Sequence, residues 1–336
     1  MKRNPAIEAL RFLFMLQICL WHFSKGLGTM EAGFLGVEFF FILSGIFIYK
    51  NLREPQYAPG IIKFTYNKIS KFYFEYVIGL LLTYLICIPY LLKHEHSLLY
   101  EILRFIAQLL FLQDTGAFPG GFNTPTWFFS ILIWSGALVY SFTRYYQKIS
   151  LRLVFPISFI FFITYCFQGS HVSNLENWDI VGFLPMPLIR GFVDISYGVL
   201  IGYLVFNYKK ILTTKIKFFN FISFIAVLLY IFIVFIGNNL TQYAFILIPI
   251  IIAGALTQNT WINNLFQNHI WVKLGKLSFS MFIIHYFIIR CLMFFNSVYY
   301  VPKFPLFIVF LIILVPVSFL FSFTCIRIKR LIKSKF

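Results

Sequence analysis

Ten apolar runs, each long enough to cross a lipid bilayer as a helix, dominate the sequence. A hydrocarbon core of about 30 Å needs roughly 20 apolar helical residues, and only segments that satisfy their own backbone hydrogen bonds can span it. We therefore expect an all-α, polytopic membrane helix bundle of about ten transmembrane helices, in a single integral membrane domain over residues 1–336. The expected spans are 6–24, 34–50, 72–92, 125–142, 151–168, 189–206, 218–236, 241–257, 278–295 and 304–326.

The charge of the chain indicates orientation and not a nucleic-acid partner. Hydrophobic residues make up 60% of the chain and charged residues 12%, which is too apolar for a water-soluble protein. The formal net charge is +17, but 21 of the 28 lysines and arginines fall on one side if both termini are cytoplasmic. The inner segments are then 1–5, 50–71, 143–150 with the adjacent Arg152, 207–217, 258–277 and 327–336.

An eleventh apolar run, at 98–112, is shorter than the other ten. It carries Glu101 and Arg104 three residues apart, which predicts an amphipathic helix that lies at the membrane interface. Letting this run cross would move the basic segment 143–150 to the outside and invert every later loop. We therefore expect ten spans, with both termini in the cytoplasm.

We expect neither a disulfide nor a metal site. The HEH triplet at 94–96 could hold a metal, but two histidines at i, i+2 in a polar loop are common without one. The N-terminal stretch resembles a signal peptide only superficially, because Glu8 and Arg11 interrupt it, so we treat it as the first span. All the cysteines lie in apolar runs without CxxC spacing and are expected to be small buried hydrophobes: Cys19, Cys87, Cys166, Cys291 and Cys325.

The first span carries an arginine near one end and a histidine near the other. Arg11 and His22 are eleven residues apart, so they leave the same helix face roughly 16 Å apart along the axis. Ionisable groups inside spans are costly and commonly functional. Glu8 and Arg11 could form only a local i, i+3 salt bridge, or Arg11 with Lys68 and Lys71 could form a basic cradle for an anionic cytosolic ligand.

A second group of polar residues lies near the expected outer ends of the spans. His22 and Glu38 are both within two turns of that surface, so a carboxylate there could fix the imidazole tautomer and make a general base. The alternative is a histidine that only packs against a neighbouring helix. Arg190 and Asp194, at i, i+4, could neutralise each other, while His285 lies near mid-membrane. The outer stretches 93–124 and 169–188 could cover a site.

Six segments resemble, in order, the acyltransferase-3 family of bacterial membrane O-acyltransferases. They are "RFLFMLQICLWH", "GVEFFFILSG", "NKISKFYFEY", "PTWFFSILIW", "IRGFVDISYGVLIG" and "LGKLSFSMFIIHY". The resemblance implies transfer of an acyl group, usually acetyl from acetyl-coenzyme A, to a hydroxyl of a cell-surface or exported carbohydrate such as O-antigen lipopolysaccharide, capsule or exopolysaccharide. It also implies a multi-pass protein of the bacterial cytoplasmic (inner) membrane with no permanently bound cofactor.

The resemblance gives the polar residues expected roles. The family requires the arginine and histidine that correspond to Arg11 and His22, whereas Glu38 stands where aspartate is usual, and lysines stand where the inner loop usually has arginines followed by proline. Arg11, Lys68 and Lys71 are expected to hold the donor, and His22, oriented by Glu38, to deprotonate the hydroxyl or carry the acyl group itself. The expected acceptor-binding residues, for a carbohydrate that can be lipid-linked, are Trp127, Arg190, Asp194 and His285.

Two other classes of protein fit the same residues. A transporter or flippase of a glycan or anionic solute would use buried charges to relay protons or bind its cargo, although no inverted repeat or broken helix pair favours it. An inactive scaffold of a glycan-assembly complex would tolerate the loss of His22.

Overall fold

The computed structural model of the chain describes residues 3–24, 30–93, 97–118, 120–167, 180–181, 184–300 and 302–333. Nearly all of these residues are helical, and the strands among them are β1 (Ile180–Val181) and β2 (Leu184–Pro185), which pair antiparallel. The HEH triplet and most of the outer stretch 169–188 lie outside the described residues.

A helix stands at each of the ten expected spans, which confirms the all-α polytopic bundle. Eight helical segments of the described chain are long and apolar enough to cross a bilayer. Five of them are single helices: α1 (Pro5–Ser24), α9 (Met186–Asn207), α11 (Ile216–Ile236), α14 (Ile270–Tyr299) and α15 (Lys303–Lys333). Two begin with a 3-10 turn: Gly33–Leu35 before α2 (Gly36–Asn51), and Thr124–Thr126 before α6 (Trp127–Tyr145). The eighth joins α7 (Gln147–Ile149), a π turn (Ser150–Val154) and α8 (Phe155–Phe167).

The other two expected spans are less regular. The helix α4 (Tyr73–Lys93) follows α3 (Ile61–Ile69) with a 51° bend between them, and α12 (Ala244–Leu256) is shorter than a full span but is preceded by a 3-10 segment (Asn238–Tyr243). The expected inner loops hold short helices: a 3-10 turn (Pro55–Tyr57), α3, α10 (Lys209–Thr214) and α13 (Trp261–Leu265).

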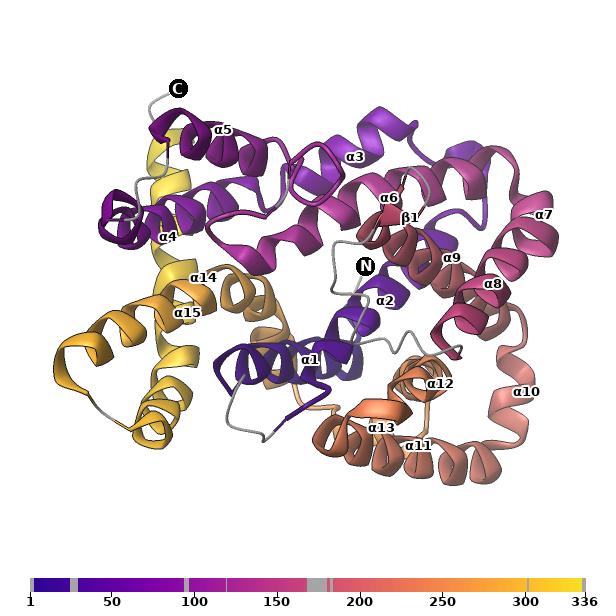
Figure 1. Cartoon of the computed structure of the whole chain (residues 1–336). Coiled ribbons are helices and arrows are strands. Elements are labelled where there is room, and N and C mark those ends of the chain that lie inside the picture. Colours follow the sequence, from indigo (N-terminus) through magenta and orange to yellow (C-terminus); the bar gives the residue numbers. More distant parts are fainter. Residues whose placement is uncertain are drawn as a thin grey trace.

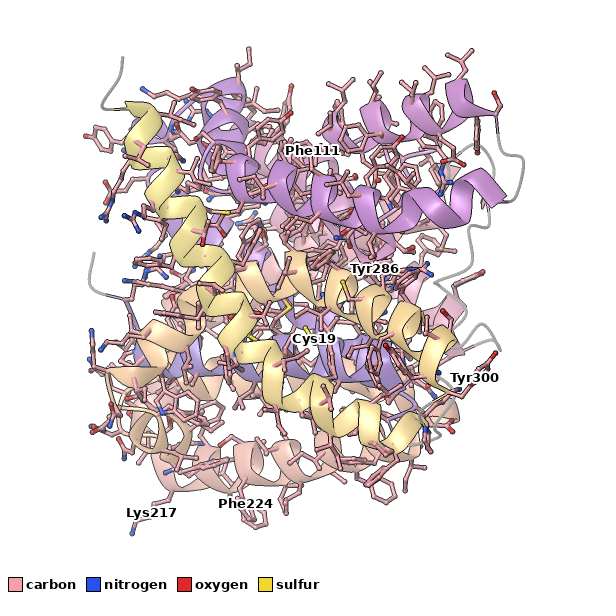
Figure 2. All side chains as sticks on the ribbon, turned by 90° about the vertical axis from the view of Figure 1, so that its left-hand side faces the viewer. Cys19, Phe111, Lys217, Phe224, Tyr286 and Tyr300 are labelled. Atoms are coloured by element: carbon pink, nitrogen blue, oxygen red, sulfur yellow. The ribbon has the colours of Figure 1, made fainter. Side chains whose placement is uncertain are left out.

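The spans pack together in one bundle. In Figure 1, α1, α2 and α14 lie between α4 and α6 above and α11 with α12 below. Figure 2 places Lys217 and Tyr300 at opposite ends of this bundle. Following the predicted orientation, we call the Lys217 end the inner end and the Tyr300 end the outer end.

The eleventh run forms α5 (Leu98–Leu109), but it does not lie flat at the interface as predicted. It runs antiparallel along α4, because Tyr84 contacts Phe105 and the Tyr76 hydroxyl donates to the Gln108 carbonyl at 2.7 Å. At twelve residues it is about 18 Å long, too short to cross. Its polar Glu101 is buried against the protein, while its apolar side chains are exposed on the outside of the bundle: Leu99, Ile102, Leu103 and Ile106.

Close packing of α2 on α9 depends on two glycines. A Cβ at Gly45 would come closer than 3.0 Å to the Ile195 carbonyl oxygen, and a Cβ at Gly198 would come equally close to the Ile42 carbonyl oxygen. Small residues at such a crossing let two membrane helices approach backbone to backbone. This contact fixes the position of α9, whose outer half bears Arg190 and Asp194.

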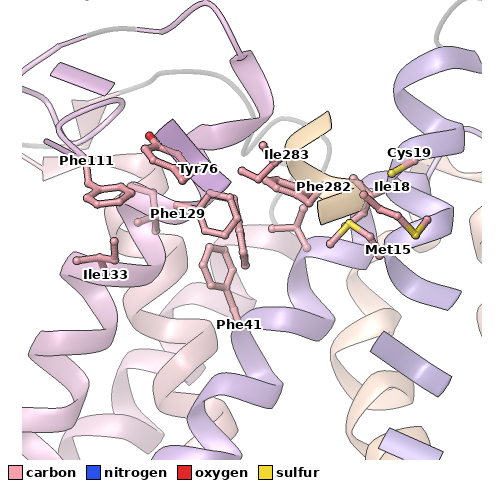
Figure 3. Close-up of a cluster of buried hydrophobic side chains, with 14 of the residues drawn as sticks. Met15, Ile18, Cys19, Phe41, Tyr76, Phe111, Phe129, Ile133, Phe282 and Ile283 are labelled. Atoms are coloured by element: carbon pink, nitrogen blue, oxygen red, sulfur yellow. The ribbon is translucent and has the colours of Figure 1, made fainter. Parts of the chain in front are cut away.

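The interior between the spans is filled by large apolar side chains. Figure 3 shows Phe41, Phe129 and Tyr76 on one side of a cluster and Phe282 with Met15 on the other. These residues come from α1, α2, α4, α6 and α14, so one continuous core joins the helices that bear the predicted site. All five cysteines are free thiols.

Candidate active site

The catalytic candidate His22 lies beside His285, on a neighbouring helix. The two imidazole rings are 5.2 Å apart between centroids, with an interplanar angle of 37°. The helices α1 and α14 run in the same direction, because Gly275 near the start of α14 contacts Glu8 near the start of α1, and the histidines meet near the other end. The structure therefore brings together a predicted catalytic residue and a predicted acceptor-binding residue.

The environment of His285 fixes its tautomer. Its Nδ1 lies 2.7 Å from the carbonyl oxygen of Phe282, and a carbonyl can only accept, so Nδ1 carries the hydrogen. The lone pair is then on Nε2, which is buried without a hydrogen-bond partner among the described residues. The ring itself is fully buried, whereas His22 is partly exposed. The site thus contains a buried imidazole acceptor next to a more accessible imidazole.

Glu38 does not lie beside His22, so the prediction that it orients the imidazole is wrong. Successive residues leading into α2 contact successively deeper turns of α1: Gly33 meets Trp21, Gly36 meets Ile18 and Phe39 stacks on Phe14. Glu38 is therefore more than one helical turn deeper than His22. The prediction assumed that α2 begins at the outer rim, whereas the chain first descends along α1 before the helix begins.

Glu38 instead forms a buried cluster with Arg190 and Asp194. The Arg190 Nε donates to Glu38 Oε1 at 2.9 Å, and Nη2 donates to the same oxygen, while Trp127 lies 5.6 Å from the guanidinium carbon. Arg190 thus pairs with Glu38 and not with its i, i+4 neighbour Asp194, whose carboxyl oxygens have no hydrogen-bond partner among the described residues. Two fully buried carboxyl groups thus lie beside one buried guanidinium.

The inner end of α1 contains the local salt bridge that its spacing predicts. Arg11 Nη1 donates to Glu8 at 3.1 and 3.3 Å, and Arg3 donates to the same carboxylate at 3.2 Å. The Arg11 side chain remains 30% exposed. Glu8 is buried against Gly275 of α14, so its carboxylate connects two arginines to the start of that helix.

Lys68 and Arg11 do not share one contact region. The Lys68 ammonium donates to the Leu132 carbonyl at 3.2 Å and to Ser44 Oγ at 3.4 Å, which places it between α2 and α6. Lys71 is exposed at the junction of α3 and α4. The three predicted donor-binding residues therefore lie on different segments of the inner half: Arg11 on α1, Lys68 on α3 and Lys71 in the turn between α3 and α4. Among the described residues no hydrogen bond or ion pair joins Arg11 to either lysine.

Sequence reasoning missed a buried amide network that holds the segment before α6. The Gln108 side chain donates to Thr126 Oγ1 at 2.9 Å and to Gln113 Oε1 at 3.1 Å, and it accepts from the Phe122 N–H at 2.9 Å. Asn123 donates to the Ile283 carbonyl of α14 at 3.0 Å. Glutamine and asparagine carry no charge signal in the sequence, so only their complete burial reveals this role.

The start of α6 lies between the two polar groups. Trp127 contacts Arg190, and three residues earlier Thr124 Oγ1 donates to the Tyr286 hydroxyl at 3.4 Å, next to His285. Phe282, which contacts His285, also packs on Phe128 and Phe129. The amide network therefore positions one helix start against both the histidine pair and the arginine cluster.

No group of three or more histidine, cysteine or acidic side chains in the described parts of the chain could hold a metal ion. The chemistry available at the site is instead that of two imidazoles: proton transfer and nucleophilic attack.

Comparisons with known proteins place these helices in a family. The model of a family described as an acyltransferase domain, acyltransferase-3, matches residues 4–327. The chain is similar to proteins named "Putative O-acetyltransferase" from Staphylococcus aureus strains MSSA476, MRSA252 and MW2, each 24% identical over 347 residues. Each match covers 95% of this chain and 56% of the relative, so the chain spans about half the length of these relatives. No solved structure matches the chain.

Proposed function

The chain belongs to the acyltransferase-3 family, and from that premise we propose that it is a membrane O-acyltransferase. It moves an acyl group, acetyl in the simplest case, from acyl-coenzyme A to a hydroxyl of a cell-surface or exported carbohydrate. The acceptor can be lipid-linked, and the protein works in the cytoplasmic membrane of a bacterium. The similar proteins carry the name "Putative O-acetyltransferase", which supports the reaction type.

The observation that carries the proposal is the contact between His22 and His285. Acyl transfer to a hydroxyl needs a group that takes the hydroxyl proton, and an imidazole is the side chain best suited to do so near neutral pH. Two adjacent imidazoles in a membrane interior are costly, which favours a functional role for them over packing alone. Their ring-to-ring distance of 5.2 Å is short enough for one imidazole to stabilise the other when it takes up a proton.

In the proposed reaction, His22 accepts the proton of the acceptor hydroxyl while the hydroxyl oxygen attacks the thioester carbonyl carbon. The C–S bond then breaks, and His22 returns the proton to the sulfur, so that the products are the O-acyl sugar and free coenzyme A. His285, with its lone pair on the buried Nε2, is a positioning residue that stabilises the protonated His22. It takes the role that the sequence assigned to Glu38.

On the donor side, we assign the charged end of coenzyme A to the inner half of the bundle. Arg11 is partly exposed there and Lys71 is exposed, which suits contact with phosphate groups, while Lys68 lies deeper between α2 and α6. Arg11 and His22 are roughly 16 Å apart on one helix, a separation that an extended pantetheine arm can bridge. The donor phosphates and the thioester would then contact opposite ends of α1.

The cluster of Glu38, Arg190 and Asp194 is buried beside the start of α6, away from the histidine pair. With at most 1% of each residue exposed, these side chains cannot reach an acceptor without displacing their own partners. We therefore assign them to positioning, through the Trp127 contact at the start of α6. This replaces their expected role in binding the acceptor directly.

Cells that carry the His22→Ala substitution test this function. We expect O-acetyl groups on the surface glycan, measured by NMR, to disappear while the amount of exported glycan is unchanged. His269→Ala is the matched control, because His269 is exposed just before the first turn of α14 and far from His22. Unchanged acetylation in a His22→Ala protein that inserts normally would refute the catalytic assignment, and lost export would favour a transporter or flippase.

A further inference from the structure

A cavity of about 360 Å³ lies toward the outer end, between α4, α14 and the segment before α6. Two arginines from different helices line it, Arg104 of α5 and Arg290 of α14. Cys87 of α4 also lines the cavity, and Thr124 and Ser297 add hydroxyls. Figure 2 shows Tyr286, which contacts Arg290, on α14 in the direction of Tyr300. The function proposed above gives this cavity no role.

The charges in this cavity are not balanced. Arg290 is exposed, donates to the Tyr286 hydroxyl at 2.5 Å and has no carboxylate partner among the described residues. Arg104 pairs with Glu101 at 3.0 Å, but its Nε is buried without a hydrogen-bond partner in the part of the chain that the structure describes. The other acid near Arg104 is Asp114, whose pKa is raised to about 7 by burial. Two guanidinium groups thus face the cavity, and only that of Arg104 is in an ion pair, with Glu101, among the described residues.

We propose that this Arg104–Arg290 cavity binds an oxyanion of the acceptor, either a phosphate of a lipid-linked carrier or a carboxylate of an acidic sugar. The planar guanidinium fork matches both groups, and two forks in one cavity bind them far better than a neutral sugar. The inference rests on the proposed function in one respect, namely that the bound anion belongs to the acceptor. Its consequence is that the protein selects acidic or phosphate-bearing acceptors.

The cavity is close enough to the histidine pair to serve the same substrate. Arg290 follows His285 by five residues, about 7.5 Å along α14 and about 140° around it, so the two side chains leave different faces and Tyr286 bridges them. Tyr286 lies between them, with its ring 6.5 Å from that of His285 and its hydroxyl bonded to Arg290. An acceptor whose anion is held by the two arginines can therefore present a nearby hydroxyl to the histidines.

Chemical labelling of Cys87 tests the cavity without any assay of acyl transfer. In a full-length protein that keeps Cys87 and has alanine at the other four cysteines, we compare an anionic and a cationic methanethiosulfonate reagent in nanodiscs. We expect the anionic reagent to react about tenfold faster than the cationic one, after each rate is divided by the rate of the same reagent with a free thiol in solution. Arg290→Gln should abolish the preference and Arg290→Lys should keep it, whereas Arg152→Gln, at an exposed arginine of the inner side, should change nothing.

Protection experiments then identify the ligand chemistry. Inorganic pyrophosphate should slow the labelling of Cys87 if the anion is a phosphate, and methyl glucuronide should do so if it is a carboxylate, while methyl glucoside should do neither. Equal rates for the two reagents in the wild-type background, or no protection by either anion, would overturn the proposal. In a transfer assay, Arg290→Gln should raise KM for the acceptor about tenfold and leave kcat and KM for acetyl-coenzyme A unchanged. If no transfer occurs in any variant but labelling behaves as expected, the proposed function fails and the anion site stands.

Discussion

The tautomer of His285 is set by its own helix. A carbonyl one turn earlier accepts from Nδ1, which leaves the acceptor nitrogen Nε2 in a pocket of aromatic rings next to His22. In the proposed reaction this imidazole orients and stabilises His22, which moves the proton, and does not touch the substrate. Its loss should therefore slow turnover without weakening substrate binding.

We predict that His285→Ala lowers kcat by roughly 10²-fold and leaves both KM values nearly unchanged, because proton transfer by His22 loses its support. Steady-state kinetics measure kcat and both KM values. A rise in KM with unchanged kcat would show instead that His285 binds the acceptor.

The residue-scale interactions that the sequence could predict are those within one helix. Helical spacing gave the pair of Arg11 with Glu8 as one of two alternatives for Arg11, and the structure contains that pair. It could not give the partner of His22, because that depends on which helices meet and at what depth. Arg190 has an acid at i+4, yet its ion pair is with Glu38 of another helix, since the close contact of α2 with α9 brings that carboxylate nearer.

At the scale of elements, the close crossing of α2 and α9 depends on two glycines, which have no side chain. Gly45 and Gly198 each face a carbonyl oxygen of the other helix, at a distance where any Cβ would clash. Because membrane helices gain little from hydrophobic burial against one another, such close packing is a main source of their association. Widening this crossing would also move Glu38 away from Arg190.

We predict that Gly198→Ala destabilises the protein by about 1–3 kcal/mol, as overpacking of a tight contact usually does. Gly60→Ala is the matched control, because a Cβ at Gly60 meets nothing within 4 Å. It should change stability by less than about 0.5 kcal/mol. Thermal unfolding in detergent compares the two variants, and equal melting temperatures would contradict the packing account.

The segment between α5 and α6 contains a pH-dependent group outside the spans. Burial raises the pKa of Asp114 from its usual 3.8 to about 7, partly offset by the Gly120 N–H, which donates to its carboxylate at 2.7 Å. The folded chain therefore keeps this proton up to about pH 7, whereas the unfolded chain loses it near pH 4. Ionisation inside the fold opposes folding, so this group's contribution to stability falls as pH rises through that range.

We predict that Asp114→Asn removes this dependence while keeping an oxygen to accept from Gly120. The melting temperature of the wild type minus that of the variant should decrease as pH rises from about 5 to about 8. A difference that stays constant with pH would mean that Asp114 titrates at its ordinary value.

Element boundaries also show what a pattern leaves open. The amphipathic pattern of α5 indicates one apolar and one polar face, but it does not say whether protein or lipid covers the apolar face. In the structure the polar face points inward, where Glu101 pairs with Arg104 and Gln108 donates to Thr126. The apolar face points outward. Internal polar partners thus reverse the orientation that an interfacial helix would have.

At the scale of the whole molecule, hydropathy was sufficient to predict the architecture. Each expected span coincides with a helix, because the length of a bilayer-crossing helix is fixed by the hydrocarbon thickness and needs no knowledge of tertiary contacts. The site needs that knowledge: α1 and α14, separated by most of the chain, must run side by side to bring His22 to His285. The resemblance in sequence could supply His22 and Arg11, but not the pairing.

The central claim is that the His22–His285 pair performs acyl transfer to a hydroxyl. Purified protein in nanodiscs, supplied with labelled acetyl-coenzyme A and glycan fractions from its own host, measures this most directly. We expect labelled, alkali-labile ester on the glycan with the wild type and with His269→Ala, and no ester above background with His22→Ala. Ester formation by folded His22→Ala at the wild-type rate would contradict the account.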